Sequence, residues 1–421
     1  MSLVVAALFF GRSSHTLLLS RLPFYSKFAQ WPASVRYGTA LFVVLRLFWW
    51  LWGALIMALM PGGLPMRPWM MPTAAPLTGM VGWLLEPWNR WDVLWYVRIA
   101  AEGYTQLDGR GAFAPLLPML IRALSPLVGG EPLAAAALVA DLACWGSLVL
   151  FFRAAEDVGV DGRRSLLALV SYPAAFFLFV PYADGLLLCC ALAAWLAARA
   201  GRWPLAGLFG ALAVLTKVTG LLLVIPLAWE AVTVWRAAGG RGWHAWRPAP
   251  WLLALPAAAF GWALVRAGLQ GQAAAFGANG VLTNLISPDF QTEWHNTVLA
   301  WPWQALAASV AAPARLWPRF EAVIAAVDLL LAAWVFMLLV RTRRLHHPGL
   351  TWFSTAVVVA NLAFIVADTP LIDAPRRWLL AFPLFLSAAT LPDRWTRLWL
   401  LVALTLQLIL AVLFVNWIMV G

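Results

Sequence analysis

Runs of apolar residues, each about as long as a membrane is thick, dominate the chain. A helix needs about 20 predominantly apolar residues to cross the hydrocarbon core of a bilayer. Runs of about this length lie at 37–60, 132–152, 165–182, 218–235, 248–267, 321–340, 348–367 and 398–420. Shorter runs, ambiguous by length alone but needed to keep the loop charges consistent, lie at 184–199, 203–217 and 378–392. The pattern predicts an all-α polytopic membrane protein with about 11 transmembrane helices.

Two connections are too long to be simple turns. They cover about 61–130 and 268–320, and both are rich in Trp, Phe and Leu. Long irregular segments in a compact domain are usually functional or disordered, and this composition argues against disorder. We therefore expect interfacial helices over the bundle. The chain divides into a leader, residues 1–36, and a single transmembrane domain, residues 37–420, with these two external segments.

Basic residues set the expected orientation. The leader is basic, and so are several short loops, as in Arg163-Arg164 and Arg341-Thr342-Arg343-Arg344. Short cytoplasmic loops carry an excess of Lys and Arg, so we expect a cytoplasmic N-terminus and the two long segments on the outer face. The bias toward Arg and Ala is typical of a GC-rich bacterial genome, which suggests the bacterial inner membrane.

Composition excludes several classes of protein. Hydrophobic residues make up 63% and charged residues 11% of the 421, far from the values of soluble domains. The net charge of +11 comes from arginines scattered between apolar runs, so a nucleic-acid partner is not expected. The three cysteines lie inside apolar runs and offer no disulfide framework.

The first external segment contains a candidate base. In the stretch from Asn89 to Tyr104, helical spacing places Asp92 and Tyr96 on one face, beside Trp91 and Trp95. A carboxylate on such an aromatic helix could take a proton from a polar acceptor. The structural alternative is that Asn89 caps a helix in which Asp92 is the third residue.

Other charged residues lie in or beside the apolar runs. Tyr182 and Asp184 are expected at the outer ends of two spans, where a carboxylate is either functional or simply solvated. Asp141 and Asp328 fall within spans, and Arg46 is a possible partner for either, so we expect structural pairing. His295 and the pair His346-His347 lack ligand spacing, and no metal site is expected.

Three blocks together resemble the PIG-V family, the GPI mannosyltransferase 2 group, and its bacterial relatives among the GT-C glycosyltransferases. They are Arg90-Trp91-Asp92 to Tyr104 with the following Phe-x-Pro-x-x-Pro; Tyr172 to Gly185, continuing to Gly207 and Thr216-Lys217-Val218-Thr219-Gly220; and Arg377-Trp378 to Phe385. They span about 90 to 385. The chain departs from the family pattern at Ala114, Leu117, Asp184 and Trp378.

The resemblance implies a GT-C-like bundle that transfers a sugar, most often mannose, from a polyprenyl-phosphate donor to a glycan, lipid or protein acceptor on the non-cytoplasmic face, with inversion. It places the catalytic acid on Asp92 and the phosphate-binding arginine on Arg377. Arg376 and Lys217 are supporting candidates, although Asp368 and Asp373 could pair with the arginines instead.

Tyr182, Asp184, Tyr96 and Trp91 complete the expected substrate-binding set. No cofactor is expected, because the lipid-linked sugar is a co-substrate, and membrane lipids surround the protein. The alternative is a non-catalytic flippase or transporter of lipid-linked sugars. Such a protein would place its charges at the midplane, between broken or repeated helices, whereas the charges here gather on one external side.

Overall fold

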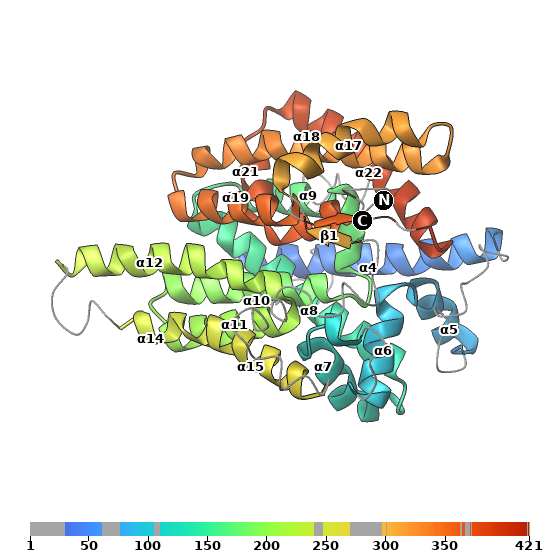
Figure 1. Cartoon of the computed structure of the whole chain (residues 1–421), viewed down its shortest axis with the longest axis horizontal. Coiled ribbons are helices and arrows are strands. Elements are labelled where there is room, and N and C mark those ends of the chain that lie inside the picture. The colour runs from blue at the N-terminus through green and yellow to red at the C-terminus, as the bar shows by residue number, and fades with distance from the viewer. Residues whose placement is uncertain are drawn as a thin grey trace.

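Helices account for almost all of this computed structural model, which describes residues 30–60, 76–104, 110–239, 247–269, 297–299, 301–362, 364–366, 371, 373–418 and 420. Most of the predicted leader, much of the second external segment, His295 and Asp368 lie outside the described residues. Most long helices run roughly parallel, along the horizontal direction of Figure 1.

Six helical stretches in the described part of the chain are long and apolar enough to cross a membrane. They are α4 (Ala33–Leu59), α8 (Pro132–Asp157), η6 (Val218–Leu223) with α12 (Val224–Ala237), α14 (Ala249–Leu252) with α15 (Ala254–Leu269), α18 (Phe320–Arg341) with η8 (Thr342–Leu345), and α22 (Asp393–Val415). Shorter apolar helices are α7 (Leu116–Leu124) with η4 (Ser125–Val128), α11 (Trp203–Thr216) and α19 (Pro348–Leu362). The protein is therefore an all-α polytopic integral membrane protein, as predicted.

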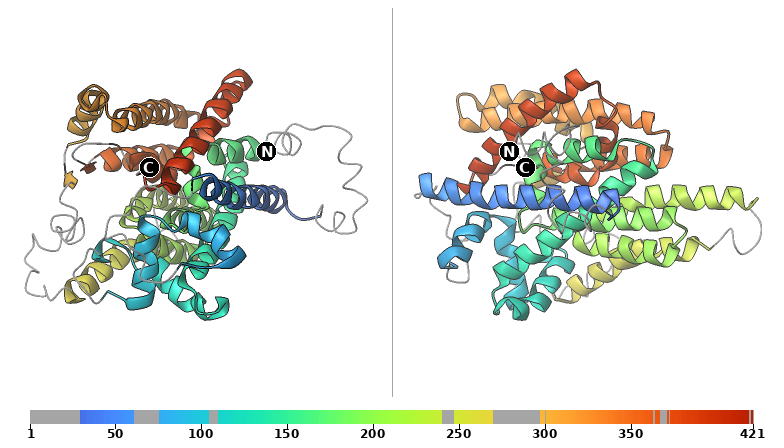
Figure 2. Two further views of the ribbon diagram at one scale, coloured as in Figure 1. Left: turned by 90° about the vertical axis from the view of Figure 1, so that its right-hand side faces the viewer. Right: turned by 180° about the vertical axis from the view of Figure 1, so that it is seen from behind.

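The exposed face of α4 illustrates the membrane setting. Leu45 and Trp49 are buried against the bundle, but Leu47 and Leu51, on the opposite side of the helix, are exposed and equally apolar. A helix that is apolar all round suits a bilayer, because lipid tails are as apolar as a protein core. In Figure 2, α4 and α22 cross on one side of the bundle and α15 lies on the other.

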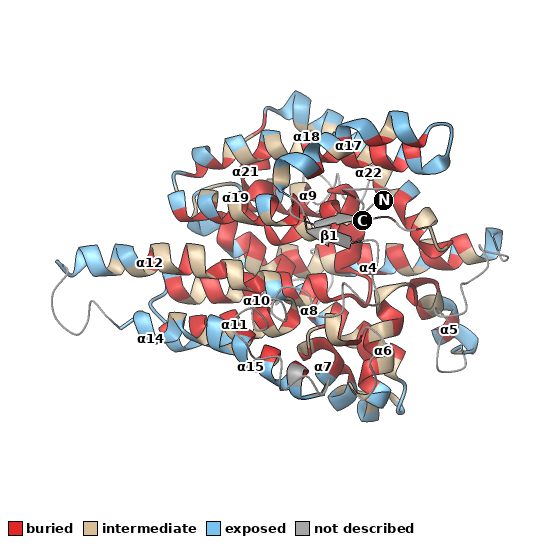
Figure 3. Ribbon diagram, viewed as in Figure 1, coloured by how far each residue is buried: buried red, intermediate tan, exposed pale blue. Residues whose placement is uncertain are grey.

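Two predicted spans, 165–182 and 378–392, were wrong as continuous helices, and a third, 348–367, is helical only to Leu362 and then includes a short strand at Phe364–Val366. The run at 165–182 forms α9 (Gly162–Val170) and η5 (Pro173–Leu178), and the run at 378–392 forms η9 (Trp378–Leu380) and α21 (Pro383–Ala388). A proline inside each run removes a backbone donor and disfavours helix in the residue before it. Every residue of η5, η9 and α21 is buried, so their apolar character reflects the protein interior (Figure 3).

Helix α10 (Ala183–Arg199) lies at the centre of the bundle and packs against α8 and α11. Glycine allows one close approach nearby: a Cβ on Gly207 of α11 would lie 2.8 Å from the carbonyl oxygen of Trp251, which belongs to α14. The first turn of α10 is itself buried, together with its residues Ala183 and Gly185. This matters because that turn carries Asp184.

The first external segment forms short helices, as expected. They are α5 (Gly79–Leu85), η2 (Glu86–Trp88), α6 (Asp92–Glu102) and η3 (Arg110–Ala112), followed by α7 and η4. From the second external segment the structure describes β1 (Thr297–Leu299) and α17 (Pro302–Leu316). Strand β1 pairs antiparallel with β2 (Phe364–Val366), which precedes the short helix α20 (Ala374–Arg377).

The predicted pairing of Arg46 is confirmed for Asp141 and wrong for Asp328. Arg46 Nε lies 2.8 Å from Asp141 Oδ1, and Arg46 Nη1 donates to the carbonyl oxygen of Phe179 (2.6 Å). Asp328 is buried in α18 and has no ion pair among the described residues. The sequence correctly predicted that Asp328 lies within a membrane-spanning helix, but it did not predict which residues surround it.

Asp141→Asn should lower the free energy of unfolding by about 3 kcal/mol, because it leaves the buried Arg46 without its counter-charge. Replacing both residues by apolar ones, Arg46→Met with Asp141→Leu, should restore most of the loss, because no charge then remains buried. Thermal unfolding of the detergent-solubilised protein measures both. Equal stability of Asp141→Asn and wild type would contradict a buried pair.

Candidate functional site

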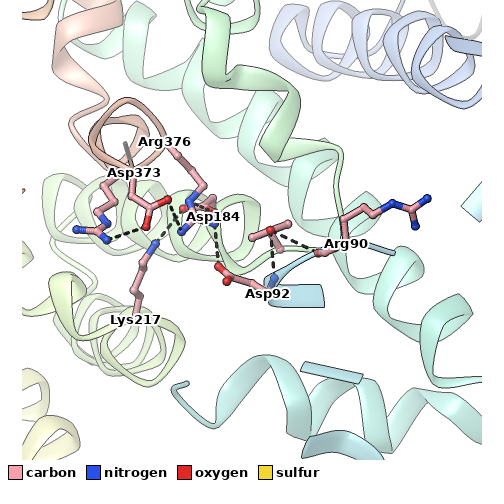
Figure 4. A network of polar contacts seen from close by, with 8 residues as sticks. Arg90, Asp92, Asp184, Lys217, Asp373 and Arg376 are labelled. Carbon is pink, nitrogen blue, oxygen red and sulfur yellow. Dashed lines mark hydrogen bonds and ion pairs between the residues drawn. The ribbon is translucent and has the colours of Figure 1, made fainter. Parts of the chain in front are cut away.

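Four segments that lie far apart in the sequence meet at one network of charged side chains (Figure 4). They are the first residue of α6, Asp92; the first turn of α10, with Asp184; Lys217, between α11 and η6; and α20 with its preceding residue, Asp373. Each of the three aspartates lies at or next to a helix N-terminus. The amide groups there favour a negative charge.

Arg376 stands at the centre of this group. Its Nη1 donates to Asp92 Oδ2 at 2.8 Å, its Nη2 lies 3.7 Å from Asp373 Oδ1, and its Nε lies 3.9 Å from Asp184 Oδ2. The side chain is only 9% exposed. One planar guanidinium therefore separates three carboxylates, which a lysine could not do with a single ammonium.

Two more cations complete the network. Lys217 Nζ donates to Asp184 Oδ1 at 3.2 Å, and Arg377 Nη2 donates to Asp373 Oδ2 at 3.0 Å. The network thus holds three carboxylates and three cations. Asp92 has the most exposed carboxylate, at 26%, against 16% for Asp373 and 4% for Asp184. Asp92 is therefore the carboxylate that a substrate can reach most easily.

An aromatic wall backs Arg376. The guanidinium carbon lies 5.3 Å from the ring centre of Phe177 and 5.0 Å from that of Tyr182. Such cation–π contacts are strengthened where water is excluded. The Tyr182 hydroxyl also accepts a hydrogen bond from the backbone N–H of Asp92 (3.2 Å), so this one side chain contacts both members of the Arg376–Asp92 pair.

The start of α6 does not match the structural alternative in which Asn89 caps the helix. The residue before the helix is Trp91, at φ 54° and ψ −119°, and Asp92 is the first helical residue instead of the third. Asn89 donates from Nδ2 to Glu86 Oε2 and does not cap the helix. A positive φ is uncommon and costly for a residue with a side chain, and such strain clusters at functional sites.

Lys217 owes its position to a break between two helices. Helix α11 ends at Thr216, and Lys217 is extended (φ −161°, ψ 134°) before η6 begins. The chain then turns back closely on α11: a Cβ on Gly220 would lie 2.5 Å from the carbonyl carbon of Ala213. Only glycine fits there without a shift, and the tight return leaves Lys217 facing Asp184.

Mutual attraction sets the charge states of the groups outside the spans. Burial lowers the pKa of Arg376, but the surrounding Asp92, Asp373 and Asp184 outweigh it and raise the pKa well above its ordinary value. Burial raises the pKa of Asp373, and the positive charges of Arg376, Arg377 and Lys217 bring it below the usual range. Both groups therefore remain charged at neutral pH.

The structure brings together six of the eight residues predicted for the site: Asp92, Tyr182, Asp184, Lys217, Arg376 and Arg377. Tyr96 lies nearby, buried against Phe113. Burial, with the charges of Asp92 and Asp184, raises the pKa of Tyr96 well above its ordinary value, so it remains a neutral phenol. Arg377 lies beside Asp373 instead of Asp92, and Trp91 lies beside Trp417.

Asp373 and Phe177 both contact Arg376 but were not among the predicted site residues; Asp373 was predicted only as a possible ion-pair partner of the arginines, and that pairing is confirmed. A signal for Asp373 was available, because it precedes Arg376 and Arg377 by three and four residues, the spacing at which helical side chains meet. Phe177 had no such signal, since it stands in an unbroken apolar run.

In the part of the chain that the structure describes, no three His, Cys, Asp or Glu side chains are grouped so that they could hold a metal ion. Comparison with protein-family models, curated proteins and solved structures gives no match for this chain.

Proposed function

We propose that the protein is a membrane glycosyltransferase that moves a sugar, most often mannose, from a polyprenyl-phosphate donor to a hydroxyl of a glycan, lipid or protein acceptor. The observation that carries the proposal is the contact between Asp92, an accessible carboxylate, and Arg376, the centre of a cluster of cations at the ends of apolar helices. A base and a phosphate-binding group thus lie within reach of one reacting sugar.

Each group has a role in the reaction. The Asp92 carboxylate takes the proton of the acceptor hydroxyl as the oxygen attacks the anomeric carbon from the side opposite the phosphate. The bond from that carbon to the phosphate oxygen breaks, and its electron pair leaves with the polyprenyl phosphate. Arg376, Arg377 and Lys217 stabilise the developing negative charge. One displacement inverts the configuration without a covalent intermediate.

Two features support a phosphate at Arg376. A guanidinium can hold two phosphate oxygens at once, whereas an ammonium acts as a point charge. Arg376 Nε is buried and makes no hydrogen bond among the described residues, since its ion-pair partner Asp184 Oδ2 lies 3.9 Å away, so the protein itself does not satisfy every donor of this guanidinium. Trp91, next to Asp92, is only partly buried and offers a ring surface for a sugar, and the apolar helices around the site suit the prenyl tail.

The orientation of the protein in the membrane is part of the same proposal. With a cytoplasmic N-terminus, the site faces the non-cytoplasmic side of what we propose is a bacterial cell membrane.

Purified protein in liposomes tests the proposal against the transport alternative. Given a radiolabelled polyprenyl-phosphate sugar and a mixture of glycan and lipid acceptors, a transferase forms a labelled glycoside and releases polyprenyl phosphate. Movement of intact labelled lipid between leaflets, without a new glycoside, would instead identify a flippase.

Sugar transfer should continue at the same rate in EDTA. A divalent ion commonly neutralises a phosphoryl leaving group between paired acids, but here the guanidinium of Arg376 lies between the three carboxylates. The measurement is the initial rate of transfer after exhaustive dialysis against EDTA. Activity lost in EDTA and restored by Mg²⁺ or Mn²⁺ would show that a metal takes part.

A further inference from the structure

Arg90 joins the turn before Asp92 to the end of α22, 325 residues further along the chain. Its Nε donates to the carbonyl oxygen of Val415 at 2.8 Å, and its guanidinium carbon lies 4.8 Å from the ring centre of Trp417. The Arg90 residue is only 8% exposed. Neither Val415 nor Trp417 belongs to the charged network around Arg376.

The same guanidinium also braces its own turn. Arg90 Nη1 donates to the carbonyl oxygens of Glu86 (2.8 Å) and Asn89 (3.0 Å). Burial lowers the pKa of Arg90 to about 10, so it is charged at neutral pH, yet it forms no ion pair among the described residues. Apart from a contact to the sulfur of Met57, its hydrogen bonds all go to main-chain carbonyls. Hydrogen bonds of this kind hold the backbone of the turn before Asp92 in place.

The backbone that it fixes is strained. Trp91, between Arg90 and Asp92, has the positive φ of 54°, and its ring lies 5.9 Å from that of Trp417. A strained conformation persists only when its surroundings over-determine it. Here Trp417 contacts both Arg90 and Trp91, and on the other side the Tyr182 hydroxyl donates to the carbonyl oxygen of Arg90 (3.5 Å).

We propose that Arg90, Val415 and Trp417 form a clamp that positions the Asp92 carboxylate for catalysis, with Arg90 and Trp417 as positioning residues. The proposal rests on the proposed function, in which Asp92 is the base. Without the clamp, Trp91 relaxes from its strained conformation and the start of α6 shifts. A misplacement of about 1 Å can cost on the order of 10²-fold in rate. The donor-binding cations lie on other segments and should be unaffected.

Arg90→Lys and Trp417→Ala should therefore each lower kcat by roughly 10- to 100-fold with little change in the KM for the polyprenyl-phosphate sugar. Lysine keeps the charge but cannot reach Val415 and Glu86 together. Trp417→Phe keeps a flat ring under the guanidinium and should retain most of the activity. Trp417→Ala, set against Trp417→Phe, remains informative if Arg90→Lys fails to fold.

Two matched controls disturb the same helix, α22, at its other end. Arg164 Nη2 donates to the carbonyl oxygen of Leu391 (2.6 Å) just before α22 begins, and Trp399 of α22 stacks on Trp334 with ring centres 3.8 Å apart. Arg164→Lys and Trp399→Ala disturb the anchoring and packing of α22 away from Asp92. Both should keep wild-type kcat. If kcat falls equally in these controls, any disturbance of α22 is enough to slow the reaction. That result would overturn the clamp.

The decisive measurement repeats Arg90→Lys in an Asp92→Asn background. If Arg90 acts through the Asp92 carboxylate, the second change adds no further loss, because the group that it positions is already gone. A further loss by the same factor as in wild type would overturn the proposal while leaving the transferase assignment intact. Full activity of Asp92→Asn alone would instead overturn the base assignment in the proposed function.

Discussion

Asp92→Asn is expected to lower the rate of sugar transfer by about 10²–10⁴-fold, the usual contribution of a general base. The change keeps the size and shape of the side chain and removes its basicity. The amide oxygen of the substituted side chain can still accept a hydrogen bond from Arg376, so the donor site should stay assembled. The loss should therefore appear in kcat, with the donor KM nearly unchanged.

Glu102→Gln is the matched control for this change. Glu102 ends the same helix that Asp92 begins, and its carboxylate pairs with Arg110. Neutralising it removes a charge from α6 without touching the Arg376 network, and turnover should stay near the wild-type value. If Asp92→Asn turns over normally, another group removes the acceptor proton.

Arg376→Lys is expected to lower turnover by about 10²-fold, the typical effect of losing one donor that stabilises a transition-state charge. A lysine keeps the positive charge but cannot contact Asp92, Asp184 and Asp373 together, nor hold two phosphate oxygens. Both kcat and the affinity for polyprenyl phosphate should therefore fall. Inhibition of transfer by added polyprenyl phosphate measures that affinity.

Arg377→Lys is the comparison that separates the two arginines. The family resemblance ranks Arg377 first, whereas Arg376 contacts Asp92 and Arg377 pairs with Asp373. If Arg376 is the main phosphate-binding group, Arg377→Lys should cost less than about 10-fold in turnover, as expected for a partly exposed pair. A larger loss of turnover for Arg377→Lys than for Arg376→Lys would instead identify Arg377 as the main phosphate-binding group.

Much of the site was predictable because its residues are polar among apolar neighbours. A charge within or beside an apolar run is costly and therefore marks a candidate functional residue. This applies to Asp92, Asp184, Lys217 and the two arginines. Which arginine faces Asp92 was not predictable. Adjacent helical residues point about 100° apart, and the sequence of α20 does not say which direction is inward.

The clamp could not be foreseen for a related reason. Arg90 and Trp417 are both ordinary residues for a membrane interface, and nothing in their local sequence indicates that they meet. Only the path of α22 across α4 brings Trp417 to Arg90. Contacts between distant segments depend on how whole helices pack, and no local spacing encodes them.

By itself, the sequence determined that this is a helical membrane protein, where most of its long helices run, and which charged residues are unusual enough to matter. Hydrophobic periodicity and length suffice for that, because the bilayer imposes them locally. Tertiary structure decided that residues 165–182 and 378–392, which prolines interrupt, form short helices that lie largely in the protein interior. Lipid and protein interior are equally apolar, so an apolar run does not reveal which of the two surrounds it. Tertiary structure likewise decided that Arg376, and not its neighbour, joins Asp92, because only the packing of α6, α10 and α20 aims those side chains at one another.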